Sequence, residues 1–347
     1  MQAPPDPARW HGRSDPDDGP RAMRWHQRVL PWHPGAAPGV ALAGFACDAG
    51  VARNQGRTGA FEGPAALRAA LGNLAWHRRG PAWDAGDVVC AGDALEEAQA
   101  ELGARVAGLL DQGQLPVLLG GGHEIAYGSF LGLAAHLAGQ ARPPSIGVVN
   151  VDAHLDLRAG ARSTSGTPFR QIAEGCAARG LVLRYLCLGV DEDANTAALL
   201  DFAARLGASW VADRDLQGGD LAAARAPLSG LLASVDCVHL SVDLDALPSA
   251  DAPGVSAPAS RGVPLWVIET LVRQVVESGK LAVADVAELC PRLDADGRTA
   301  RVAARLVARI AGDGGAAPGG RERRTAATPS TRAGDPPPSG HAKGDPP

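Results

Sequence analysis

Two apolar patterns alternate along the chain. Short apolar runs typical of buried strands fall at residues 40–45, 116–119, 145–151, 182–189, 209–212, 237–242 and 281–289. Between them, apolar residues recur three or four positions apart, which predicts helices at residues 63–71, 94–112, 124–137, 194–206, 264–278 and 298–311. Because strands and helices alternate with short linkers, the pattern predicts an α/β fold with a doubly wound, mostly parallel sheet and helices on both faces.

Composition agrees with such a sheet and sets the limits of the domain. Hydrophobic residues make up 46% of the 347 residues but aromatic residues only 4%, so we expect an aliphatic core. Residues 1–20 and 313–347 are rich in Pro, Gly and charged side chains and lack a periodic apolar pattern. Such segments bury too little surface to offset the entropy of ordering, so both are expected to be poorly ordered. A single domain is then expected at residues 21–312.

Charge and cysteine usage narrow the classes of function. The net charge is −5 and no basic cluster stands out, which argues against a nucleic-acid partner. No apolar run reaches the ~20 residues that span a bilayer, and no apolar stretch near the N-terminus is typical of a signal peptide. The six cysteines are scattered without a CxxC pair, so a disulfide framework or a structural zinc site is not expected. These features predict a cytoplasmic protein without a membrane partner.

Three of the predicted strands end in polar motifs. The motifs are GGGHE at residues 120–124, NVDAHLDLR at 150–158 and SVDLDAL at 241–247. In a doubly wound sheet, the carboxyl ends of the strands form the crevice that holds the working residues. We therefore expect the three motifs to meet.

The middle motif carries Asp152, His154 and Asp156 at alternate positions. In extended backbone, alternate side chains share one face, so these three are expected to point the same way. Carboxylates aimed together repel one another unless a cation lies between them. Oxygen and imidazole ligands without thiolate suit manganese, magnesium, iron or zinc.

The other two motifs complete a larger ligand set. His123 adds a second imidazole, and Asp243 and Asp245 add two carboxylates. Six protein ligands exceed what one metal with an open position takes, which favours two metals ~3.5–4 Å apart with a hydroxide between them. Taken singly, the motifs have plainer interpretations: a solvated loop or structural ion site, a common strand end, and a helix entry. Their coincidence at one sheet edge favours a functional site.

These motifs resemble those of the ureohydrolases, the family of arginases, agmatinases and formimidoylglutamases. The DAHLD and SVDLD segments match the two metal-binding signatures of that family, and residues 59–68 (GAFEGPAALR) resemble its N-terminal loop and first helix. The resemblance spans nearly all of the predicted domain. It implies an arginase-like fold, two Mn²⁺ ions per chain, and a homo-oligomer that is a trimer or a hexamer.

The resemblance also implies how the ligands are shared between the metals. One Mn²⁺ ion would be held by His123, Asp152, Asp156 and Asp243. The other would be held by Asp152, His154, Asp243 and Asp245. Asp152 and Asp243 would then be the bridging carboxylates.

Two catalytic roles follow from the same resemblance. Asp156 would carry a proton to the departing nitrogen. Glu288, in the segment DVAELCP, would pair with the cationic carbon–nitrogen head of the substrate. The plainer interpretation of Glu288 is a strand-end carboxylate with no such role.

Departures from the arginase pattern indicate one branch of the family. Gly122 and Glu124 replace the Asp and Ser of the usual GGDHS segment, Arg158 stands where arginases have Asn, and Phe169 stands where they have His. These changes resemble formimidoylglutamases, which convert N-formimidoyl-L-glutamate and water to L-glutamate and formamide.

The charge of that substrate agrees with the changes. A substrate with two carboxylates needs extra positive charge at its site, and the fork of an arginine binds carboxylates well. Arg158 supplies such a charge beside the metal ligands, and Arg57, Ser165 and Arg170 are further candidate substrate-binding residues. The plainer interpretation of these arginines is that they lie at the surface.

Three rival functions stay open. The nearest is another ureohydrolase that acts on arginine, agmatine or a guanidino acid. A non-catalytic, metal-binding regulatory protein on the same fold would be expected to lose ligands, and all six are present. A two-metal phosphoesterase usually uses Asn or additional His. The sequence favours a binuclear manganese hydrolase acting on a linear amidine carbon–nitrogen bond of a small molecule.

Overall fold

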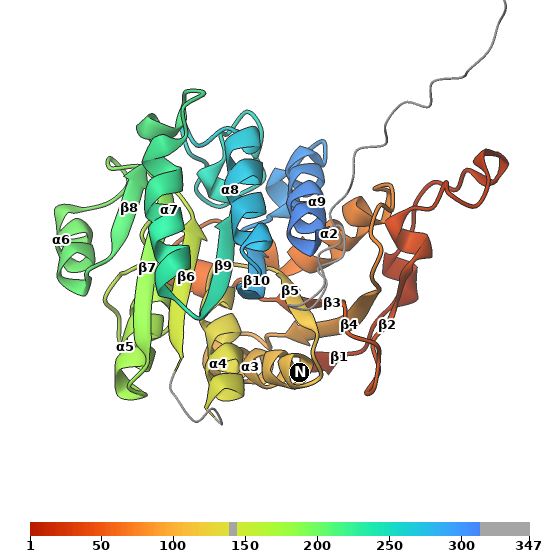
Figure 1. The fold of residues 1–347 in the computed structure, drawn as a ribbon, viewed down its shortest axis with the longest axis horizontal. Coiled ribbons are helices and arrows are strands. Elements are labelled where there is room, and N and C mark those ends of the chain that lie inside the picture. The colour runs from red at the N-terminus through yellow and green to blue at the C-terminus, as the bar shows by residue number, and fades with distance from the viewer. Residues whose placement is uncertain (139–143, 313–347) are drawn as a thin grey trace, which may run out of the picture. The chain divides into compact units, whose positions relative to one another are not determined.

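The fold is centred on one sheet, which the computed structural model shows together with its flanking helices for residues 1–138 and 144–312 (Figure 1). The strands are β1 (Gln2–Ala3), β2 (Val29–Pro31), β3 (Val40–Ala46), β4 (Ala82–Val89), β5 (Leu115–Leu119), β6 (Ser145–Val151), β7 (Val182–Val190), β8 (Ser209–Ala212), β9 (Cys237–Asp243) and β10 (Leu281–Ala287). Their order is β1-β4-β3-β5-β10-β9-β6-β7-β8, with β2 paired to β4. Among these pairings only β1–β4 is antiparallel.

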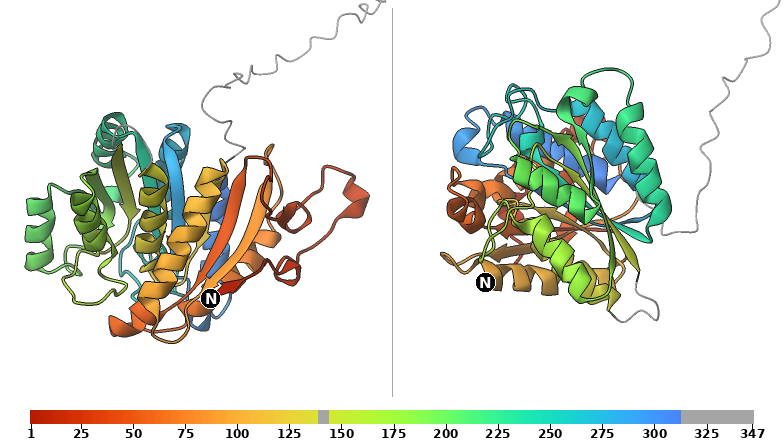
Figure 2. Two further views of the ribbon diagram at one scale, coloured as in Figure 1. Left: turned by 90° about the horizontal axis from the view of Figure 1, so that it is seen from below. Right: turned by 90° about the vertical axis from the view of Figure 1, so that its left-hand side faces the viewer.

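Helices cover both faces of the sheet (Figure 2). They are α1 (Ala49–Arg53), α2 (Gly63–Gly72), α3 (Leu95–Asp111), α4 (Ile125–Leu137), α5 (Pro168–Ala178), α6 (Ala197–Leu206), α7 (Ala222–Ser234), α8 (Leu265–Glu277) and α9 (Arg298–Ala311). Short 3₁₀ turns are η1 (Pro7–Arg9), η2 (Pro16–Asp18), η3 (Trp25–Gln27), η4 (Ala60–Glu62), η5 (Asp213–Leu216), η6 (Leu244–Ala246) and η7 (Pro291–Leu293).

Two aliphatic cores explain this layering. One core joins the sheet to α2, α7, α8 and α9 through side chains such as Leu67, Leu228 and Val272. The other joins the opposite face to α3, α4, α5 and α6 through side chains such as Leu102 and Phe130. Strands buried on both sides need no polar alternation, which is why β3 is apolar along its whole length. The predicted α/β fold with a mostly parallel, doubly wound sheet is confirmed.

Every strand and helix that the sequence predicted is present, but β1, β2, β4, α1, α5 and α7 were missed. Strand β4 contains Asp84, Gly86 and Asp87, which hide its apolar pattern. These acids are buried because Arg68 of α2 binds them, with Nη2 2.9 Å from Asp84 Oδ1 and Nη1 2.7 Å from Asp87 Oδ1. A strand with buried ion pairs does not show the alternation that sequence patterns detect. Helix α7 carries Pro227 in its interior, which is usually a helix-breaking signal.

The first twenty residues differ from the poorly ordered segment that the sequence predicts. Strand β1 pairs with β4, the indole of Trp10 donates to Asp84 Oδ2 over 2.7 Å, and Arg9 forms an ion pair with Asp87. The composition of residues 1–20 does not show that the segment is ordered, because two buried carboxylates far along the chain, Asp84 and Asp87, supply its partners. The prediction for residues 313–347 lies outside the described residues. Among the helices that are described, none has the length and apolar character needed to cross a membrane.

Candidate metal centre

Four adjacent strands at the middle of the sheet place the polar motifs in one row. The register pairs Val151 of β6 with Val242 of β9, Asp243 of β9 with Ala287 of β10, and Val286 of β10 with Leu119 of β5. The residues after these positions therefore leave the sheet at the same edge, as expected for the carboxyl ends of parallel strands. The predicted meeting of the three motifs is observed.

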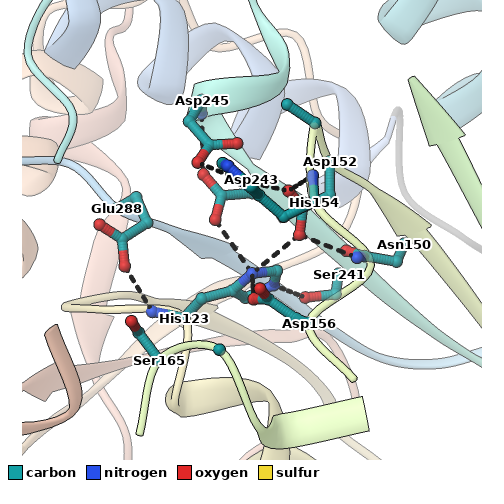
Figure 3. Close-up of polar contacts among 12 residues, drawn as sticks. His123, Asn150, Asp152, His154, Asp156, Ser165, Ser241, Asp243, Asp245 and Glu288 are labelled. Atoms are coloured by element: carbon teal, nitrogen blue, oxygen red, sulfur yellow. Dashed lines mark hydrogen bonds and ion pairs between the residues drawn. The ribbon is translucent and has the colours of Figure 1, made fainter. Parts of the chain in front are cut away.

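The first group of candidate ligands surrounds His123, which is 1% exposed. Its Nδ1 lies 2.9 Å from Asp156 Oδ2, 2.9 Å from Asp243 Oδ2 and 3.1 Å from Asp152 Oδ2 (Figure 3). Three carboxylates thus converge on one ring nitrogen that is buried and for which the described residues supply no hydrogen bond. His123, Asp152 and Asp243 offer ligand atoms close enough together to hold one metal ion.

The second group surrounds His154, whose side chain is 25% exposed. Its Nδ1 lies 3.0 Å from Asp245 Oδ2 and 3.5 Å from Asp152 Oδ1. Asp152 belongs to both groups, with one carboxylate oxygen toward each histidine. This is the arrangement of a bridging carboxylate. Asp243 differs, because among the described residues it lies in the His123 group and not in the His154 group.

Turns, not extended backbone, bring the ligands together. The backbone N–H of His154 donates to Asp152 Oδ1 over 2.6 Å, and that of Asp245 donates in the same way to Asp243. In both motifs the first aspartate therefore closes a turn on the residue two positions later. Asp156 has a φ of +48°, in the left-handed region. The expected alternation along an extended strand was wrong, although the residues it selected do converge.

The charges of this cluster are poorly compensated by the protein. Burial raises the pKa of Asp243 well above its ordinary value, and the neighbouring Asp245 raises it further. Burial also raises the pKa of Asp245 to about 6 against the opposing effect of His154. The charge of Asp245 in turn raises the pKa of His154. Buried carboxylates in this state are stabilised by divalent cations, so the donor set fits two metal ions with oxygen and imidazole ligands.

Glu288 lies against the metal-ligand loop. Its Oε1 accepts from the backbone N–H of His123 over 2.8 Å, whereas Oε2 is buried and has no hydrogen-bond partner among the described residues. Its φ is +69°, a conformation that costs energy in a residue other than glycine and is often kept at functional sites. Burial and the charge of Asp243 raise its pKa well above the usual range. The free oxygen is available to a cationic substrate group.

Glu124 occupies space that glycines leave open. It accepts from the backbone N–H of Gly50 over 2.9 Å and from the thiol of Cys47 over 3.4 Å. A Cβ at Gly122 would lie 2.2 Å from Glu124 Oε2, so the two departures from the GGDHS pattern depend on each other. Burial raises the pKa of Glu124 to about 7.

The candidate substrate-binding residues differ in how they are held. Arg158 is exposed, its side chain packs over Gly166, and none of the described residues hydrogen-bonds its guanidinium. Ser165 accepts from Asn54 Nδ2 over 3.1 Å and lies on the Glu288 side of His123 (Figure 3). Arg57 instead donates to the carbonyl oxygens of residues 255 and 256, both over 2.8 Å.

Arg170 points toward α6. Its Nε is 3.0 Å from Glu174, and its guanidinium lies over the ring of Phe202 at 4.3 Å. Arg158 and Arg170 nevertheless line the same surface hollow, of about 390 Å³. The substrate-binding roles of Arg57, Arg158, Ser165 and Arg170 stay predictions.

Sequence reasoning missed the polar residues behind the ligands. Asn150 donates to Asp152 Oδ2 over 3.0 Å, and the hydroxyl of Ser241 lies 2.9 Å from His123 Nε2. Both residues stand two positions before a ligand in the printed motifs, which is the one signal that could have found them.

Comparison with known proteins agrees with the fold and the site. The arginase-family profile matches residues 38–312. The chain is 55% identical to the formimidoylglutamase of Ralstonia nicotianae over 89% of this chain and 96% of that protein. For the formimidoylglutamase of Chromobacterium violaceum, the identity is 54%, over 86% and 95% of the two chains. The chain therefore belongs to the arginase family.

Solved structures show the same fold. Formiminoglutamase of Trypanosoma cruzi, solved with Mn²⁺, superposes with a TM-score of 0.70 at 28% identity, over 79% of this chain and 94% of that one. Formimidoylglutamase of Bacillus subtilis superposes with a TM-score of 0.74 at 22% identity, over 86% and 93%. These matches agree with the predicted arginase-like α/β fold.

Proposed function

We propose that this protein is a formimidoylglutamase, which hydrolyses N-formimidoyl-L-glutamate to L-glutamate and formamide with two manganese ions. The observation that carries the proposal is the 54–55% identity to two relatives of that name over most of each chain. The cluster of two histidines and four aspartates supports it, because these side chains converge on a buried site.

The donor set supports manganese. Carboxylate oxygens and imidazole nitrogens without thiolate suit that ion, and a related structure was solved with it. His123, Asp152, Asp156 and Asp243 would hold one ion, and Asp152, His154, Asp243 and Asp245 the other. When bound, the two ions would offset the carboxylate charge and lower the pKa of a water molecule that attacks the substrate.

The protein's own residues position the amidinium and move the proton. Glu288 Oε2, which has no partner in the described part of the chain, accepts an N–H of the amidinium and holds its carbon over the cluster. Asp156 is the most exposed of the candidate carboxylate ligands, with 12% of its side chain accessible. The resemblance to the ureohydrolases assigns to Asp156 the transfer of a proton to the glutamate nitrogen as the carbon–nitrogen bond breaks and water supplies the oxygen of formamide, and its partial exposure supports that role. Arg158, whose guanidinium has no hydrogen-bond partner among the described residues, binds a carboxylate of the substrate.

The resemblance extends the proposal to the cellular setting. We expect an enzyme of histidine breakdown in the cytoplasm that assembles as a trimer or hexamer. Sedimentation of the purified protein tests the assembly, and a mass near that of a single chain would contradict it.

A substrate comparison tests the function. Manganese-loaded protein is supplied with N-formimidoyl-L-glutamate, arginine or agmatine, and glutamate, formamide and urea are quantified. We expect glutamate and formamide in equal amounts from the first substrate only. Rapid formation of urea from arginine or agmatine would replace this function by that of another ureohydrolase. Metal binding without turnover of any of the three would indicate a regulatory protein.

A further inference from the structure

A chain of buried hydrogen bonds runs from His123 into the core, on the side of the ring opposite the carboxylates. His123 Nε2 lies 2.9 Å from Ser241 Oγ, and the Ser241 hydroxyl donates to Asp285 Oδ1 in a short hydrogen bond. The other oxygen of Asp285 accepts from Ser129 Oγ over 2.7 Å and from His239 Nε2 over 2.6 Å. All of these side chains are 0–1% exposed.

The register of the sheet brings the residues of this hydrogen-bond chain together. Asp285 of β10 is the direct register partner of Ser241 of β9, and His239 stands two positions earlier on the same face of β9. Ser129 reaches the carboxylate from α4, which packs against β10. The chain therefore consists of rigid elements and contains no loop residue apart from His123.

The protons of the chain can be assigned. Asp285 is fully buried, yet its hydrogen bonds and the neighbouring His239 outweigh the effect of burial and lower its pKa, so it is an anion that only accepts. Ser241 has one proton and donates it to Asp285. Its oxygen must then accept from His123, which places a proton on Nε2. The lone pair of Nδ1 is left to face Asp152, Asp156 and Asp243.

A buried carboxylate is a poor way to stabilise a core. Removing an ion from water costs several kcal/mol, and apolar side chains of similar volume often serve the fold as well or better. Asp285 contacts no candidate metal ligand directly, but it is connected to His123 through one hydroxyl. A carboxylate behind a metal-binding histidine fixes the ring and makes it a stronger ligand.

We propose that Asp285 is a positioning residue for the metal position of His123, acting through Ser241, with His239 and Ser129 holding its carboxylate. The proposal depends on the proposed metal centre but not on the substrate. It also applies to one metal position only. His154 is 25% exposed, and no residue in the described part of the chain hydrogen-bonds its Nε2. We call the hydrogen-bonded series His123–Ser241–Asp285 the relay. Loss of the relay should therefore weaken one metal position and spare the other.

Metal titration of the full-length protein tests this proposal. Asp285→Asn removes the charge while keeping the shape. We expect the Mn²⁺ affinity of one position to fall by about 10–100-fold, the usual effect of changing such a partner. At limiting Mn²⁺, bound metal should fall from about two ions per chain to about one. The electron paramagnetic resonance signal of coupled ions should give way to that of single Mn²⁺ ions.

Three variants separate this role from a structural one. Ser241→Ala breaks the relay and should weaken the same position, whereas Ser129→Ala keeps both the charge and the relay and should have a smaller effect. Asp294→Asn is the matched control, because Asp294 is also a buried carboxylate but caps α9, accepting from the N–H groups of Thr299 and Ala300. It should lower the melting temperature and leave both metal affinities unchanged.

The outcomes are distinct. Equal weakening of both positions by Asp285→Asn, or a lower melting temperature with unchanged metal affinity, would overturn the proposal. If Asp285→Asn does not fold, Ser241→Ala decides, and unchanged metal binding in that variant would also overturn it. Wild-type protein that binds two metals but leaves N-formimidoyl-L-glutamate intact would contradict the proposed function without affecting this inference.

Discussion

The metal cluster differs in burial and in hydrogen bonding from the arginine rim, by which we mean the surface at Arg158, two positions after the candidate ligand Asp156. The cluster is buried, its aspartates close turns on their own backbone, and polar residues hold its ligands from behind. The rim is exposed, and Arg158 has no hydrogen-bond partner for its guanidinium among the described residues. We therefore propose that the sheet determines where the metals bind, whereas side chains on loops determine which substrate is accepted. Substitutions in the two regions should therefore have different effects.

The largest effect is expected when the bridging ligand is removed. Asp152→Ala deletes the carboxylate shared by both histidine groups. Metal content should fall below one ion per chain, and kcat/KM should fall by at least about a thousandfold, because a bound metal supplies several kcal/mol of catalysis. Metal analysis and steady-state kinetics measure both. Asp251→Ala, at a partly buried aspartate on the loop after η6, is the control. Near-normal turnover of Asp152→Ala protein would contradict the two-metal site.

Glu288→Gln should act on the substrate and not on the metals. The amide keeps an oxygen for the N–H of His123 but loses the charge that faces the amidinium. Charge-assisted hydrogen bonds contribute about 1.5–3 kcal/mol, so kcat/KM should fall by roughly a hundredfold. Metal content should stay at the wild-type value. If the metals are lost instead, Glu288 supports the His123 loop and does not hold the substrate.

Arg158→Asn should change substrate affinity alone. The variant removes the exposed guanidinium at the rim and should raise KM for N-formimidoyl-L-glutamate by roughly 10–100-fold, since one charge-assisted contact is lost. Metal content and kcat should change little. A changed metal affinity with an unchanged KM would mean that Arg158 balances the charge of the aspartates. The cluster and the rim would then not have separate roles.

The sequence predicts the cluster better than its surroundings for a physical reason. His123, Asp152 and Asp243 follow apolar runs, and parallel strands bring their carboxyl ends together, so convergence could be inferred without coordinates. The backbone that achieves it could not, because the turns at Asp152 and Asp243 depend on local hydrogen bonds.

The relay was missed for a different reason. Ser241 and Asp285 lie 44 positions apart and meet only through the register of β9 and β10. A single sequence does not give that register. Strand β4 was missed in the same way, because Arg68 neutralises its buried acids from another element. Apolar periodicity detects elements that bury apolar side chains and overlooks those that bury ion pairs.

The smallest effect is expected from Arg170→Ala, which tests how far the rim extends. Arg170 lines the same hollow as Arg158, and its charge could reach a second carboxylate of the substrate. Its guanidinium is already engaged by Glu174 and by the ring of Phe202. Surface ion pairs and exposed cation–π contacts each contribute about 0.2–1 kcal/mol, so the variant should lose at most ~1–2 kcal/mol of stability. KM should change by less than about threefold, because a guanidinium held in this way has little freedom to bind substrate.

Arg205→Ala removes the other arginine near Phe202 and serves as the matched control for charge in the hollow. A rise in KM as large as that of Arg158→Asn, with Arg205→Ala unaffected, would make Arg170 a substrate ligand. The specificity of the site would then depend partly on helix α5 and not only on the loop after β6.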